Sequence, residues 1–178
     1  MILKQQDAAG VVTFSNRIEA FIPPKAKRDY LIQILHALEH RGPSGETNVG
    51  KILEEIGGQM KRRGLVILVS DLLDDPDQIL KGLRLFRFKG NDVIVFHLLD
   101  QAELDLPFDG NILFEDLEAA NLKVVADPRS IRNTYRAVVQ EFITEMRKKC
   151  HDNAIDYQLI STSTRLDQAL ASYLSWRE

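Results

Sequence analysis

The residues best suited to hold a divalent cation lie in two loops. Asp71 directly follows the apolar run 65–69, where a strand is expected to end, and Asp74 and Asp75 add negative charge nearby. In open α/β sheets, ligands bind at the carboxyl ends of strands. Mg²⁺ prefers oxygen ligands, and Thr47 can add a hydroxyl oxygen from a neighbouring loop. On spacing alone, a helix cap or a solvated loop carboxylate is the simpler explanation of Asp71.

Other reactive side chains do not converge. His36 and His40 have zinc-compatible spacing, but the sequence offers no obvious third ligand. The segment 45–51 matches the spacing of a phosphate-binding loop, yet Ile52 stands where a hydroxyl should reach Mg²⁺. A single cysteine, Cys150, excludes an internal disulfide and a multi-cysteine zinc site. Nothing in these patterns predicts nucleophilic catalysis.

The composition limits the class of protein. A length of 178 residues, with 44% apolar and 28% charged residues, fits one globular domain spanning 1–178. The net charge of −3 argues against a nucleic-acid surface, which needs clustered Lys and Arg. No apolar run approaches the roughly 20 residues of a membrane span. The polar start of the chain does not resemble a signal peptide, so we expect a cytoplasmic protein.

The elements that must position these residues follow from hydrophobic periodicity. Strands alternate with helices, which predicts an α/β sheet with helices on both faces. Because the run 65–69 does not alternate, we expect it to be covered on both faces. We expect Pro23–Pro24 to end the second strand and a hairpin to join 112–114 to 122–125. The strands are predicted at 8–15, 19–22, 65–69, 93–99 and 157–160, and the helices at 27–40, 49–60, 76–88, 128–153 and 166–176.

Several stretches together resemble a bacterial von Willebrand factor A-like family of unknown function, whose genes often accompany MoxR-type AAA+ ATPases. Their order and spacing carry the resemblance, which covers essentially the whole chain. The stretches are Gly10–Asn16, Phe21–Pro24, Gly64–Pro76, Leu98–Leu104, Pro107–Gly110, Leu113–Glu118 and Asp156–Tyr157.

The resemblance implies a Rossmann-like, mostly parallel sheet with helices on both faces and a β-hairpin insertion. It also implies that Thr47 and Asp71 fall on the second and third loops of a metal-ion-dependent adhesion site. The family's first central strand and its Asp-x-Ser-x-Ser loop have no counterpart here. We therefore expect an N-terminally truncated domain with a degenerate half-site that binds Mg²⁺ weakly at most.

The missing strand has a physical consequence. In the family it lies between the strands at 8–15 and 65–69, so its loss leaves two edges with unpaired backbone groups, which tend to recruit other strands. Three outcomes are open: the two strands pair directly, a second copy pairs with the edge, or the natural protein is longer. We favour a homodimer or another form of self-association.

These observations predict a non-catalytic protein-interaction module, and the family resemblance implies that it works with a MoxR-type ATPase in protein assembly or remodelling. Two alternatives remain open from the sequence. One is a metal-dependent enzyme that uses Asp71, with Asp74 and Asp75, for phosphoryl or hydrolytic chemistry. The other is a truncated remnant without function.

Overall fold

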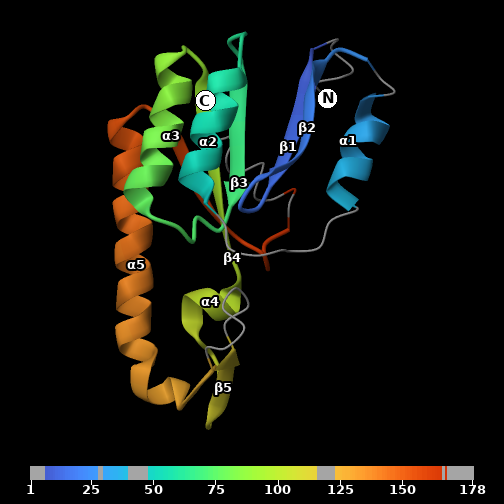
Figure 1. The fold of residues 1–178 in the computed structure, drawn as a ribbon. Helices are drawn as coiled ribbons and strands as arrows, with labels where there is room; N and C mark the ends of the chain where they lie inside the picture. Colours follow the sequence, from blue (N-terminus) through green and yellow to red (C-terminus); the bar gives the residue numbers. More distant parts are fainter. Residues whose placement is uncertain (1–6, 28–29, 40–47, 116–122, 166, 168–178) are drawn as a thin grey trace.

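The central sheet has three parallel strands in the order β3 (Leu65–Ser70), β4 (Asp92–Leu99) and β7 (Asp156–Ser161) (Figure 1). The computed structural model describes residues 7–27, 30–39, 48–115, 123–165 and 167. Val95 of β4 pairs with Leu68 of β3 on one side and with Tyr157 of β7 on the other. The predicted α/β class with a mostly parallel sheet is confirmed.

Three helices cover one face of this sheet: α2 (Val49–Gln59), α3 (Pro76–Phe88) and α5 (Pro128–Asp152) (Figure 1). Each begins where the sequence predicts, because a side chain caps its first turn. Asn48 accepts from the Lys51 amide, Asp75 from the Asp77 amide and Asp127 from the Arg129 amide. The core beneath them includes Ile52, Leu53, Leu68, Ile79, Leu83, Phe86, Val95, Met146 and Cys150.

Helices α2 and α3 approach each other closely at two glycines. A Cβ atom on Gly82 would lie 2.5 Å from the Cβ of Leu53, and one on Gly50 would lie 2.7 Å from the backbone of Gln78. Real Cβ contacts are essentially never that short, so this helix pair depends on side chains of hydrogen size at both positions.

The first hairpin forms a sheet of its own. Strands β1 (Ala9–Phe14) and β2 (Ile18–Lys25) pair only with each other within the described residues, and α1 (Tyr30–Glu39) contacts both. The outcome in which β1 pairs directly with β3 is therefore not the one observed. The prediction that Pro23–Pro24 ends the second strand is wrong, since β2 continues to Lys25. Proline is tolerated there because an edge strand has amides that need no partner in the sheet.

The expectation that 65–69 is covered on both faces is also wrong. Leu68 is 4% exposed, whereas Leu65, Ile67 and Val69 are 48%, 46% and 54% exposed. The helices pack on the face that carries Leu68, and β3 pairs only with β4 in the part of the chain that the structure describes. An apolar run thus marks a strand here without marking two covered faces.

A second hairpin extends from the far end of β4 (Figure 1). Helix α4 (Gln101–Asp105) leads to its two strands, β5 (Ile112–Glu115) and β6 (Lys123–Ala126). The predicted hairpin between 112–114 and 122–125 is confirmed, and in the observed register Leu113 pairs with Val125. Helix α4 was not predicted, although Asp100 and Glu103 form a capping box that indicates its start. The helix predicted at 166–176 lies almost wholly outside the described residues.

We predict that Gly82→Ala lowers the free energy of unfolding by about 1–3 kcal/mol, because the new methyl group forces α2 and α3 apart. Gly58→Ala is the matched control: it lies on α2, and a Cβ atom added there would have nothing within 4 Å. That change should be neutral or stabilise by up to about 1 kcal/mol through helix propensity. Urea denaturation measures both, and equal effects of the two variants would contradict the close approach.

Candidate functional site

The turn after β3 carries Asp71 at the carboxyl end of the sheet. The Asp71 carboxylate accepts a hydrogen bond from the Leu73 amide at 3.2 Å, and the Ser70 hydroxyl accepts one from the Leu72 amide at 3.0 Å. Leu72 adopts a φ of 56° while its side chain is fully buried. A non-glycine residue rarely adopts that conformation, so core packing of Leu72 holds the turn that presents Asp71.

The two other acidic residues of this loop serve as helix caps. Asp74 accepts from the Val49 amide at 2.8 Å, so it caps the start of α2 from another part of the chain. Asp75 accepts from the Asp77 amide at 2.9 Å and caps α3. Carboxylates at these positions also complement the positive ends of the two helix dipoles. Both side chains therefore have a structural role that needs no ligand.

The predicted partnership of Thr47 with Asp71 lies outside what the structure describes, because Thr47 is not among the described residues. Across the described ranges, no group of three or more His, Cys, Asp or Glu side chains is placed to hold a metal ion. The described donor set at this loop is the carboxylate of Asp71 beside two capping carboxylates. That set by itself does not make a cation site, since Mg²⁺ needs several oxygens in octahedral geometry.

A buried histidine on β4, the strand next to Asp71, contacts a partly buried tyrosine on β7. His97 of β4 pairs in register with Ser70, the residue before Asp71, and its side chain is fully buried. Its Nδ1 atom lies 2.5 Å from the Tyr157 hydroxyl. The ring of Phe142 on α5 meets the imidazole edge-on, with centroids 5.8 Å apart. His97 thus links the middle of the sheet to α5 and β7.

Burial lowers the pKa of His97. The backbone and the carboxylate of Asp71 act in the opposite direction, but the effect of burial is larger. Within the described structure, the Nε2 atom of His97 is buried without a hydrogen-bond partner. Burial likewise raises the pKa of Tyr157. The sequence places His97 in a strand, but the contact with Tyr157 depends on a pairing between strands 60 residues apart. In the sequence, this contact is indicated only by a polar side chain on each of two strands that become neighbours in the sheet.

Among the described residues, Cys150 offers no reactive site. Cys150 is fully buried, and burial raises the pKa of its thiol to about 12, so the thiolate is not accessible near neutral pH. The spacing of His36 and His40 is not tested, because His40 lies outside the described residues.

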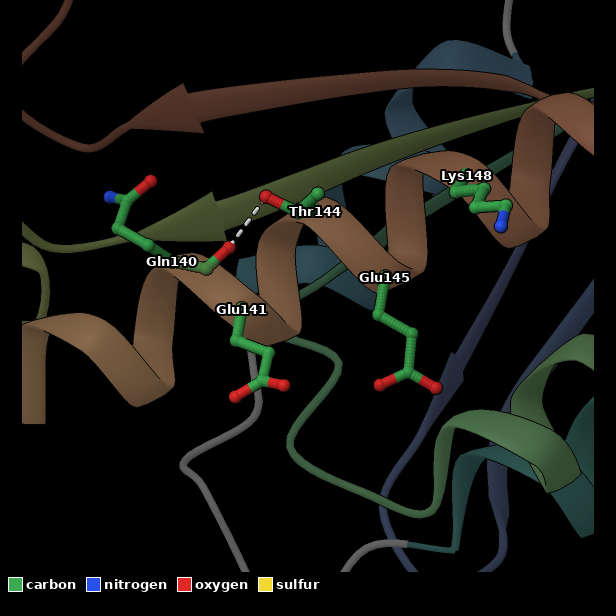
Figure 2. A pocket seen from close by; sticks show the side chains of 5 residues that line it. All are labelled: Gln140, Glu141, Thr144, Glu145 and Lys148. Atoms are coloured by element: carbon green, nitrogen blue, oxygen red, sulfur yellow. Dashed lines mark hydrogen bonds between the residues drawn. The ribbon is translucent and has the colours of Figure 1, made fainter.

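An open hollow of about 450 Å³ lies on the outer surface of α5 (Figure 2). Its lining comes from one helix only, and Figure 2 shows the Glu141 and Glu145 carboxylates on the same side of that helix. Glu145 pairs with Lys149 at 2.7 Å, and Thr144 donates to the backbone of Gln140. A hollow that is lined by a single helix, and in which one of the two acidic side chains is already paired, is a surface feature rather than a binding site.

A family model described as a protein of unknown function, DUF58, matches residues 1–144. The chain belongs to the DUF58 family. None of the curated proteins compared with this DUF58 chain matches it in sequence. The part of the chain that the structure describes has no helix with the length and apolar character of a membrane span.

Two solved structures are similar to the DUF58 chain in fold. One is a conserved hypothetical protein BatB from Bacteroides thetaiotaomicron, with a TM-score of 0.60 at 16% identity, over 98% of this chain and 82% of that one. The other is an aerotolerance-related membrane protein from Bacteroides fragilis, with a TM-score of 0.58 at 14% identity, over 95% of this chain and 79% of that one. At such low identity the likeness establishes the fold alone.

The buried imidazole predicts a pH dependence of stability. His97 has a folded-state pKa below its ordinary value of 6.5, so below pH 6.5 the unfolded chain binds a proton that the folded chain resists. The free energy of unfolding should therefore fall as the pH falls from 6.5 toward the folded pKa, by at most about 1.4 kcal/mol per pH unit. His97→Gln should flatten this part of the profile in urea titrations between pH 5 and 8.

His151→Gln is the control for that comparison, because the side chain of His151 is 87% exposed. Its profile should follow that of the unaltered protein. If His97→Gln and the unaltered protein lost stability in parallel below pH 6.5, the buried-histidine explanation would be wrong.

Proposed function

We propose that this DUF58 chain is a non-catalytic protein-interaction module, spanning residues 1–178, that works with a MoxR-type AAA+ ATPase in protein assembly or remodelling. The observation that carries the proposal is an exposed apolar surface on the β5–β6 hairpin. Leu113 and Val125 face each other across the two strands and are 51% and 67% exposed. Apolar side chains gathered on one exposed face favour contact with another protein.

The base of this hairpin is held in place by two arginines of α5. Arg132 donates to the backbone oxygens of Leu106 and Phe108 at 2.9 and 2.7 Å and pairs with Asp109 at 2.9 Å. Arg136 donates to the backbone oxygen of Asp105 at 3.0 Å. Guanidinium groups that bind several acceptors fix geometry as well as charge. A preorganised surface loses less conformational entropy on binding, which supports a recognition role.

We also propose three properties that accompany this role. The module retains a weak Mg²⁺ half-site formed by Asp71 and Thr47, and it needs no other cofactor. It self-associates through its sheet edge. It acts in the cytoplasm, where ATP is available to the partner ATPase.

Binding to a purified MoxR-type ATPase encoded in the same genome tests the main proposal. We expect Leu113→Ser combined with Val125→Ser to weaken binding at least tenfold, because two apolar contacts are lost. Val138→Ser is the matched control: it also replaces an exposed apolar side chain, at 60% exposure, but on α5. Surface-immobilised titration measures the affinity. No binding of the unaltered chain, or equal losses in both variants, would overturn the proposal for this surface.

Calorimetric titration with Mg²⁺ and Mn²⁺ tests the half-site. We expect weak binding that Asp71→Ala abolishes, because that change removes the carboxylate at the sheet end while leaving the caps Asp74 and Asp75 in place. Asp92→Ala is the control, since Asp92 is an exposed carboxylate at the opposite end of a strand, paired with Arg87. Absence of heat with both cations, or heat that survives Asp71→Ala, would show that Asp71 holds no metal ion.

A further inference from the structure

The outer edge of β3 has the features of a strand that pairs with another strand. Its six residues carry no charge, and Leu65, Ile67 and Val69 alternate along one exposed face. Natural edge strands usually carry a charge, a proline or a bulge that prevents pairing. Across the described residues β3 pairs only with β4, so the backbone groups of its outer edge pair with no described strand.

The charges that flank β3 would face opposite charges if a second copy of β3 lay antiparallel to it. A basic run, Lys61–Arg63, precedes the strand and Asp71 follows it. If two copies of β3 run antiparallel about a two-fold axis at Ile67, Arg63 of one copy lies opposite Asp71 of the other. In the same register Leu65 lies opposite Val69, so the exposed apolar side chains meet one another. Opposite charges and apolar pairs are the cross-strand contacts that stabilise antiparallel strands.

We infer that β3 pairs with β3 of a second copy, antiparallel and centred on Ile67, to form one continuous sheet across a dimer. This inference rests on the proposed self-association and assigns its register. The interface is isologous, because each copy presents the same strand to the other. A strand from another protein would need an uncharged centre, a basic residue before it and an acidic residue after it to match β3. A second copy of this chain has that pattern, so it is the partner that we infer.

The β1–β2 hairpin would have to move away from β3 before a second copy could pair along the whole strand. Val12, Phe14 and Ile18, near its turn, pack against the core that contains Leu68. In the view of Figure 1, the distance between the hairpin and β3 increases away from the turn of the hairpin. Full pairing therefore exchanges these three apolar contacts for cross-strand contacts among the exposed apolar side chains of β3 in the two copies, together with backbone hydrogen bonds along the edge.

Cysteine cross-linking of the whole chain reads the register directly. Ile67→Cys should form a disulfide dimer under mild oxidation, because the two Cβ atoms lie about 4.5–5.5 Å apart on the axis. Val69→Cys alone should not, because its two copies are about 13 Å apart along the strands. Val69→Cys mixed with Leu65→Cys should cross-link. The buried Cys150 of the unaltered chain sets the background.

Sedimentation of charge variants provides the second readout. Arg63→Asp and Asp71→Arg should each weaken the dimer at least threefold, and the two changes together should restore it. Circular dichroism of each variant shows that it remains folded.

A chain that stays monomeric at 100 µM would overturn the inference, as would a dimer in which Ile67→Cys does not cross-link or the double charge variant fails to recover. A monomer that still binds the ATPase would leave the interaction role standing. A dimer of the inferred register that binds no ATPase would leave only the inference standing.

Discussion

Strand β4 is hydrogen-bonded along both of its edges, to β3 on one side and to β7 on the other, and this pairing forms the sheet on which α2, α3 and α5 pack. Because both neighbours satisfy its backbone groups, its side chains can be apolar and buried along nearly the whole strand. Val93 and Val95 then form part of the core on which α2, α3 and α5 pack. The same pairing brings Asp71 near His97, since Ser70 and His97 are register partners.

The carboxyl end of the sheet shows how structural and ligand-binding uses of carboxylates compete. Asp74 and Asp75 accept backbone amides at the starts of α2 and α3, where a negative charge stabilises the helix. Asp71 is different, because it caps no helix and binds only within its own turn among the described contacts. Hydrogen bonds from backbone amides to all three carboxylates therefore hold this loop in place.

The exposed apolar surfaces of the β5–β6 hairpin and of β3 differ in kind. The β5–β6 hairpin shows side chains whose strands already pair with each other, so it suits contact through side chains alone. Strand β3 shows side chains together with unpaired backbone groups, so it suits the addition of a strand. A single chain can in this way present one surface to a second copy and another to a different protein.

Local sequence alone determined the elements: the caps Asn48, Asp75 and Asp127 start helices where predicted, and the pairing of Leu113 with Val125 follows from one short hairpin. These signals act within a few residues. Tertiary structure decided the rest. The exposure of Ile67, the course of β2 through its prolines and the contact of His97 with Tyr157 depend on which strands become neighbours. That choice is set by packing between distant segments, which local periodicity does not encode.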